Sequence, residues 1–278
     1  MNRIIPMEAA LYHADYSAWS RSMLSTFRES KREAFLRYVE KSAPEESTNG
    51  AMKLGSLAHT LLLEPHQINN RFVVIPKELL AKNGAISTKD AKQFVMDNEE
   101  AGREVVKQKE WDETKKVVDS ILKVCGKWLE KATQIEHAIY WNDPVTGLAL
   151  KARPDWIVRT PTEVFIFDLK TTTRIIPHTF SRVVETHEYW LQESHYRQGE
   201  SVVSGTKPHM FFVGIEQSWP YRAGLFQLSQ ESRDKSFECW RYLVNEVSHA
   251  IEKNAWADLW EDEITVMDLK DYVFRSAS

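Results

Sequence analysis

Hydrophobic residues in the first 131 positions recur mainly at spacings of three and four, which is the period of an amphipathic helix. The segment 18–40 carries the clearest stripe, made by Met23, Leu24, Phe27, Phe35 and Leu36. It therefore predicts one helix or two. The same pattern predicts a helix at 51–64 that ends before Pro65, a polar and mostly helical stretch at 77–110, a helix at 111–131, and one short strand at 72–76.

After residue 132 the pattern changes to short runs of β-branched and aromatic residues separated by turn residues. The expected strands are 133–141, 148–158, 163–170, 209–216 and 221–228, and the expected helices are 181–205 and 230–254. This order predicts a central mixed sheet flanked by helices, in the α/β (α+β) class. We expect a single domain with a helical part at 1–131, a sheet core at 132–228, and a C-terminal helix with an acidic tail at 229–278.

Two charged residues end the most hydrophobic of these strands. Asp168 and Lys170 follow the apolar run 164–167, and being two residues apart they point to one face of the strand. Burying either charge alone is costly, so a partner or a metal ion is expected. The other interpretation, a surface salt bridge on a solvated strand, fits the apolar run before Asp168 less well.

A third charged residue is expected to lie opposite Asp168. If 148–158 and 163–170 form an antiparallel hairpin about Pro161-Thr162, position 155 faces position 168 at about 5 Å. Two carboxylates at this short distance repel each other unless a proton or a cation lies between them. Asp155 and Asp168 therefore predict a divalent cation with oxygen ligands. Such a cation, with Lys170 beside it, suits the hydrolysis of a phosphodiester.

Two helical pairs supply further candidates. Gly55 and His59 are four residues apart and share a helix face, so a small residue would let His59 approach the sheet. Gln192 and Tyr196 have the same spacing and could bond a DNA phosphate or Lys170. A packing histidine and an ordinary polar helix face are the alternatives.

The composition narrows the possible classes of protein. The two cysteines, Cys125 and Cys239, are too few for a disulfide scaffold or a four-cysteine iron–sulfur cluster, and they favour a reducing, cytoplasmic location. The first residues lack the apolar core of a signal peptide, and no apolar run approaches the ~20 residues that span a bilayer. We therefore expect no membrane association.

The net charge of −4 is spread unevenly along the chain. Residues 229–278 carry six Lys/Arg and eleven Asp/Glu, so the rest of the chain is close to neutral and slightly positive. An acidic tail is compatible with a basic site elsewhere. Net charge therefore does not exclude a nucleic-acid substrate.

Four segments, in this order, resemble the motifs of a known family. GSLAH at 55–59, RPD at 153–155, DLK at 168–170 and QESHY at 192–196 are similar to the G-x-x-x-H, (G/P)-D, D-x-K and Q-x-x-x-Y motifs of RecB-type nucleases in the PD-(D/E)XK superfamily. Within that group the chain looks most like the exonuclease domain of RecE (exodeoxyribonuclease VIII). The resemblance covers about residues 15–230, and RPD replaces the G-x-x-D of many relatives.

The resemblance implies a restriction-endonuclease-like core and a set of site residues. Mg²⁺, for which Mn²⁺ can substitute, would be held by His59, Asp155, Asp168 and the carbonyl of Leu169. Glu136 would help to hold the metal or the attacking water. The catalytic residues implied are Lys170, Asp155, Asp168, Glu136, Gln192 and Tyr196.

RecE-like proteins also suggest a substrate and partners. The resemblance implies a 5′-to-3′ exonuclease acting on ends of double-stranded DNA, which leaves 3′ overhangs for phage or prophage recombination. It implies a homo-oligomer, namely a ring-shaped tetramer, and a single-strand annealing protein as partner. Two alternatives stay open: another RecB-type nuclease acting on single-stranded DNA or as an endonuclease, and a catalytically silent DNA-binding protein of the same fold.

Overall fold

The computed structural model describes residues 2–44, 53–258, 260, 264 and 266–268. The helices are α1 Ala9–Ala14, α2 Arg21–Glu29, α3 Lys31–Ala34, α4 Lys53–Leu63, α5 Ile68–Arg71, α6 Lys89–Glu100, α7 Gln108–Leu129, α8 Pro177–Thr186, α9 Tyr189–Ser204 and α10 Gln230–Lys253. The strands are β1 Arg3–Pro6, β2 Phe72–Val74, β3 Glu104–Val106, β4 Gln134–Ile135, β5 His137–Asn142, β6 Ala149–Ala152, β7 Trp156–Arg159, β8 Val164–Thr172, β9 His209–Glu216 and β10 Ala223–Phe226.

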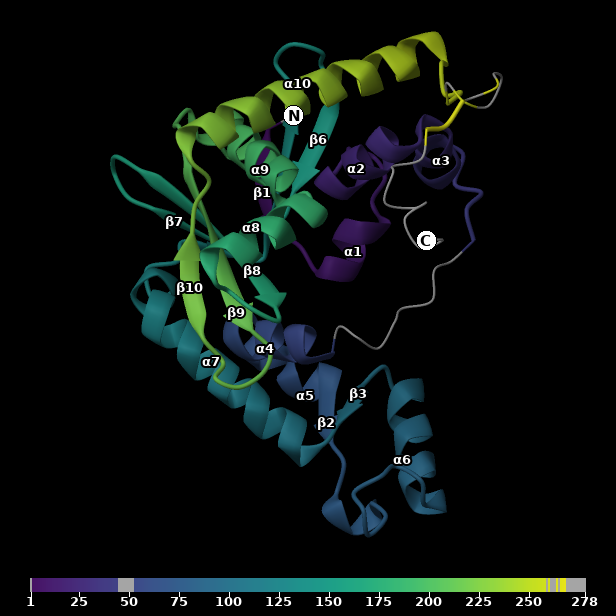
Figure 1. Ribbon diagram of the computed structural model, residues 1–278, viewed down its shortest axis with the longest axis vertical. Helices are drawn as coiled ribbons and strands as arrows, with labels where there is room; N and C mark the ends of the chain where they lie inside the picture. Colours follow the sequence, from purple (N-terminus) through teal and green to yellow (C-terminus); the bar gives the residue numbers. More distant parts are fainter. Residues whose placement is uncertain (1, 45–52, 259, 261–263, 265, 269–278) are drawn as a thin grey trace, which may run out of the picture.

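A five-stranded sheet with the order β10-β9-β8-β7-β4 forms the centre of the molecule (Figure 1). The β8–β9 pair is parallel and the other pairs are antiparallel, so the predicted mixed sheet flanked by helices is confirmed. The predicted pairing of 209–216 with 221–228 and the long final helix are confirmed as β9, β10 and α10.

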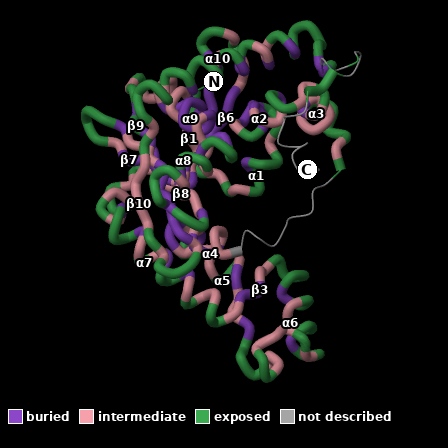
Figure 2. The backbone as a smooth tube through the Cα atoms, viewed as in Figure 1, coloured by how far each residue is buried: buried purple, intermediate pink, exposed green. Residues whose placement is uncertain are grey.

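The two faces of this sheet pack against different helices because side chains alternate along each strand. Ile157 and Ile166 face a core shared with α2, α9 and α10. Trp156 and Phe167 stack on each other, with ring centroids 4.9 Å apart, on the other face, against α4 and α7. Figure 2 shows the buried residues gathered where α9, β6 and β8 meet.

The predicted strand 148–158 is in fact two strands in two sheets. β6 pairs with β5 in a three-stranded sheet of order β1-β5-β6, whereas β7 belongs to the five-stranded sheet. Pro154 lies in the break, where it has no N–H to give to a ladder. The predicted strand 133–141 is likewise divided, into β4 and β5, at Glu136, whose φ is 58°.

Two of the predicted helical segments, 181–205 and 77–110, differ from the structure in detail. The segment 181–205 is divided between α8 and α9 at Glu188, which has a left-handed backbone with φ 53°. The segment 18–40 forms two helical units, as one of the two expected forms: α2, and then α3 continuing into a π-helical turn at Phe35–Val39. The segment 77–110 contains α6 but also β3, which pairs with β2 in a small parallel sheet. Residues 51–52 of the predicted helix 51–64 lie outside the described residues.

A buried polar chain fixes α9 against its neighbours. The Nδ1 of His195 accepts a hydrogen bond of 3.0 Å from Trp240 Nε1 in α10, so its Nε2 carries the proton and donates to the carbonyl of Lys151 in β6 at 2.8 Å. Burial lowers the pKa of His195 to about 4, which keeps the ring neutral. The position of α9 over β8 is therefore set by specific bonds as well as by apolar packing.

Among the described residues, no helix is both long and apolar enough to cross a bilayer.

Candidate active site

Asp155 lies where the chain passes from one sheet to the other. Trp156 pairs with Phe167 and Ile157 with Ile166, so the same register places Asp155 opposite Asp168, as predicted. The hairpin turns at Pro161-Thr162, as predicted: the register places Thr160 opposite Glu163, and Thr160 N donates to Glu163 O at 2.9 Å across the turn. Two-residue loops favour Gly or Asn, which this loop lacks.

The carboxylate of Asp155 connects three segments of the chain. Its Oδ2 accepts a hydrogen bond of 2.6 Å from the backbone N–H of Leu169, and its Oδ1 lies 3.2 Å from Nε2 of His59. Its backbone carbonyl accepts a bond of 2.9 Å from the N–H of Glu136. Asp155 thus ties the D-x-K segment of β8, the helix α4 and the β4–β5 junction to one point.

His59 reaches this point because α4 packs closely on the sheet. A Cβ on Gly55 would lie 3.3 Å from Oγ1 of Thr171 at the end of β8, so even alanine would require a shift of a few tenths of an ångström. From this position Nε2 of His59 lies 2.7 Å from Oε1 of Glu136 as well as close to Asp155. The expected close approach of α4 is present.

The donor atoms of His59, Glu136 and Asp155 all lie within 4.8 Å of one another. Two carboxylates and an imidazole nitrogen at this separation suit a divalent cation, whose ligands lie about 2.0–2.6 Å away. The left-handed backbone of Glu136 turns its side chain to this side, where Arg153 also forms an ion pair with it. The residues present therefore fit a bound metal ion.

The contacts of Asp168 differ from those predicted for a metal ligand. Its Oδ2 lies 2.5 Å from Nζ of Lys170, and its Oδ1 accepts a bond of 2.7 Å from Nε2 of Gln192 in α9. The ammonium of Lys170 lies 4.1 Å from the ring centroid of Tyr189. The group of three donors thus contains Glu136 and not Asp168, and Leu169 contributes its N–H to Asp155. The metal-ligand roles of Asp168 and of the Leu169 carbonyl stay predictions.

A family described as "PDDEXK-like domain of unknown function (DUF3799)" matches residues 20–262. The chain belongs to this PDDEXK-like family. No curated protein sequence matches it. Its fold is similar to that of "Putative exonuclease" from Eubacterium rectale, with a TM-score of 0.58, 12% identity, and coverage of 98% of this chain and 98% of that chain.

The electrostatics of the PDDEXK-like site follow from burial and close carboxylates. Burial lowers the pKa of His59, but Asp155 and Glu136 outweigh it and raise this pKa to about 10. Burial raises the pKa of Asp168 to about 6; Lys170 opposes this change and Asp155 adds to it. Burial also acts to raise the pKa of Asp155, but the charge of His59 and the bond from Leu169 bring it below its usual value. Without a metal, the raised pKa of His59 favours a protonated imidazole between Asp155 and Glu136, and burial raises the pKa of Glu136 as well.

The predicted contacts of Gln192 and Tyr196 with Lys170 are not those observed. Gln192 bonds Asp168, and the hydroxyl of Tyr196 donates to the carbonyl of Arg153 at 3.3 Å. From α9, Gln192 thus holds the D-x-K motif, and Tyr196 holds the RPD motif. Their predicted catalytic roles stay predictions.

Sequence reasoning missed two residues of this PDDEXK-like site. Arg153, quoted as part of RPD but given no role, pairs with Glu136. Tyr189, under Lys170, is three residues before Gln192 and seven before Tyr196 on one helix face. That i, i+3, i+7 spacing is the signal that could have indicated it.

The site opens into a cleft of about 570 Å³. The helix α4 lines one side with Gly55 and His59, and the end of β8 lines the other with Lys170 and Thr171. Of the charged groups of the site, His59 and Lys170 therefore face the cleft directly.

Proposed function

We propose that this chain is a divalent-metal-dependent deoxyribonuclease that removes nucleotides from the 5′ ends of double-stranded DNA and leaves 3′ overhangs. The observation that carries the proposal is the placement of Asp155 beside the Asp168-Leu169-Lys170 segment, with His59 and Glu136 completing a set of metal donors. Membership of the PDDEXK-like family supports the nuclease chemistry. The motif resemblance to RecE supports the choice of substrate and polarity.

The proposed residues divide the work between metal binding and charge stabilisation. His59, Glu136 and Asp155 would hold the cation, proposed to be Mg²⁺ or Mn²⁺, and Asp168 would complete its ligands by rotating away from Lys170. A bound divalent cation polarises a phosphate and lowers the pKa of water. Lys170 would donate to the water and to the phosphate oxygens as negative charge grows on them. Tyr189 and Gln192 would keep Lys170 and Asp168 in position.

The test is digestion of linear duplex DNA labelled at either the 5′ or the 3′ end, with Mg²⁺, with Mn²⁺ and with EDTA. The expected result is metal-dependent release of 5′-terminal nucleotides, with covalently closed circles left intact. Rapid cutting of closed circles would replace the exonuclease proposal by an endonuclease. DNA binding without cleavage under every metal would favour the catalytically silent alternative.

We also propose the ring-shaped tetramer that the RecE resemblance implies. A ring would gather positive charge from several chains around DNA, which suits a chain whose own net charge is −4. Light scattering coupled to size-exclusion chromatography measures the mass directly. A mass of one chain of 32.3 kDa at micromolar concentration would contradict the ring.

A further inference from the structure

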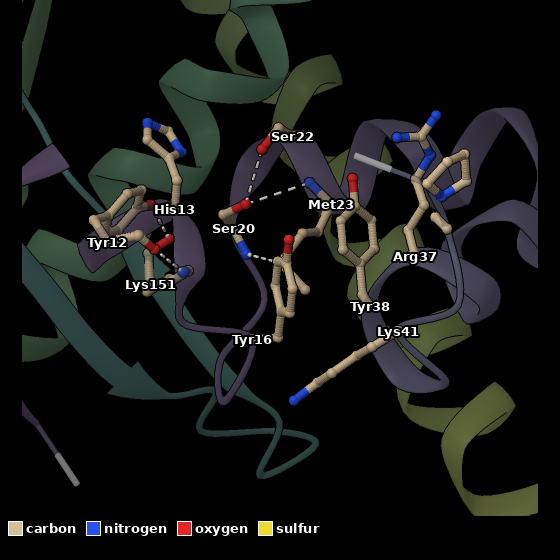
Figure 3. A pocket seen from close by; sticks show the side chains of 12 residues that line it. Tyr12, His13, Tyr16, Ser20, Ser22, Met23, Arg37, Tyr38, Lys41 and Lys151 are labelled. Atoms are coloured by element: carbon tan, nitrogen blue, oxygen red, sulfur yellow. Dashed lines mark hydrogen bonds between the residues drawn. The ribbon is translucent and has the colours of Figure 1, made fainter. Parts of the chain in front are cut away.

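A second cavity adjoins the cleft of the candidate active site. It has a volume of about 520 Å³, within the range of small-ligand pockets. We call it the tyrosine pocket, after Tyr12, Tyr16 and Tyr38, which line it (Figure 3). The segment from α1 to the start of α2 forms one part of its wall, and the π-helical turn with Lys41 forms another.

The lining of the tyrosine pocket is positively charged. Arg37, Lys41 and Lys151 contribute to it, and among the described residues that line it none carries a carboxylate. Lys151 is buried, with its ammonium bonded to the carbonyls of Tyr12 and Asp15. Arg37 donates its Nε to Glu33, which lies outside the lining. In a chain of net charge −4, such a lining indicates an anionic ligand.

The aromatic rings of the pocket form a stacking surface. The rings of Tyr16 and Tyr38 have centroids 5.6 Å apart and are tilted by 55°. Tyr38 is fixed by a 3.0 Å bond to Oγ1 of Thr26 and by an edge contact with Trp19. Tyr16 is 39% exposed, and Nζ of Lys41 lies 5.8 Å from its ring centroid. A rigid ring beside an exposed ring and a cation is the arrangement that binds bases of single-stranded nucleic acid together with their phosphates.

The pocket and the cleft are neighbours. His13 lines both, and the cleft contains His59 and Lys170. His13 is therefore the residue at which a strand bound at Lys170 would pass into the tyrosine pocket.

We propose that the tyrosine pocket binds an unpaired deoxynucleotide, with its base on Tyr16 and its phosphate at Lys41 and Arg37, next to the nucleotide that is cleaved. The inference rests on the proposed nuclease function, because it assigns the substrate strand to this pocket. The same chemistry has two sources: a nucleotide within the strand and a released mononucleotide.

The test measures by calorimetry how tightly the tetranucleotide dT4 binds to the full chain. The measurement is made in EDTA, where metal-dependent cleavage cannot occur. Tyr16→Leu should weaken binding about fivefold or more, because one stacked base is lost. Lys41→Gln should weaken it and reduce its salt dependence by about one counterion. Tyr16→Phe keeps the ring and should bind as the wild type does. Tyr242→Leu is the matched control, because Tyr242 lies on α10 and is 62% exposed.

Two further probes separate stacking from charge and the strand from a mononucleotide. An abasic tetranucleotide should bind the wild type more weakly than dT4 does. Its affinity should not change in Tyr16→Leu. Binding of dT4 that is much tighter than that of dTMP supports a strand site, whereas similar affinities support a site for the released nucleotide.

Wild-type affinity for dT4 in both Tyr16→Leu and Lys41→Gln, in proteins with unchanged circular dichroism, overturns the inference. If the chain then still cleaves DNA, the proposed nuclease function survives alone. If dT4 binding depends on Tyr16 but no metal supports cleavage, the pocket survives and the nuclease proposal fails.

Discussion

The carboxylate of Asp155 accepts a hydrogen bond of 2.6 Å from the backbone N–H of Leu169, the residue between Asp168 and Lys170. The register puts Asp155 directly opposite Asp168, so this bond joins the two motifs just beyond the β7–β8 ladder. The two acidic motifs are therefore held together by the backbone as well as by any metal ion. This predicts how substitutions at the site should divide between stability and activity.

Asp155→Asn should abolish nuclease activity and remove the ion pair with His59, but it should cost less stability than Asp155→Ala, because the amide oxygen can still accept from Leu169. Asp155→Ala should abolish activity and also lower the free energy of unfolding by about 1–3 kcal/mol, since the N–H of Leu169 then lacks an acceptor. Urea denaturation and a gel-based digestion assay measure the two effects. Asp119→Asn, an exposed position on α7, is the control. Full activity in Asp155→Asn would refute the assigned site.

His59 should make metal binding depend on pH. Its pKa is raised to about 10, so below that pH the metal must displace a proton. Between pH 6.5 and 8.5 the affinity for Mn²⁺ should therefore rise by up to about tenfold per pH unit, with one proton released. In the metal-free protein, the stabilisation from the charged imidazole is fully present below the unfolded pKa of His59 and is lost as pH rises through about 10.

Calorimetry in buffers of different ionisation enthalpy counts the protons released. His59→Gln should bind Mn²⁺ more weakly and with a flatter pH dependence, whereas His249→Gln, exposed on α10, should match the wild type. An unchanged pH dependence in His59→Gln would mean that another group supplies the proton.

Lys170→Ala should retain metal binding and lose turnover by about 10²–10³-fold, as is typical when a contact made mainly in the transition state is removed. Lys170→Arg should not restore full activity, because a planar guanidinium cannot replace a compact ammonium between Asp168 and the ring of Tyr189. Single-turnover kinetics with saturating Mg²⁺ separate turnover from binding. If Lys170→Ala no longer binds metal, the lysine organises the site instead of acting on the substrate.

Two glycines in helices should respond in opposite directions to alanine. A Cβ on Gly199 in α9 would lie 2.6 Å from a ring atom of the buried Trp141, so Gly199→Ala should lower the free energy of unfolding by about 1–3 kcal/mol. A Cβ on Gly126 in α7 meets only Leu122 at 3.8 Å, and Gly126→Ala should raise stability by up to about 1 kcal/mol. Parallel urea titrations make the comparison. Equal effects of the two substitutions would show that α9 can shift away from β5.

The sequence by itself determined the relation between Asp155 and Asp168. Alternation along a strand has a period of two residues, and the apolar runs on both strands leave one register that buries them. The same local rules placed His59 four residues after Gly55, on the helix face that packs on the sheet. Only the resemblance indicated Glu136. The strand before it, β4, is short and is followed by this left-handed residue, so it leaves no clear hydrophobic pattern in the sequence.

The tertiary structure decided which groups meet. The division of 148–158 between two sheets at Pro154 brings Arg153 to Glu136, and the break at Glu188 turns α9 so that Gln192 bonds Asp168 and not Lys170. The tyrosine pocket joins Tyr16 and Tyr38 to Lys151, more than 100 residues away in the chain. Local patterns specify the period and the buried face of each element, but contacts between distant segments depend on how whole elements pack, and the energy of that packing is shared among many residues.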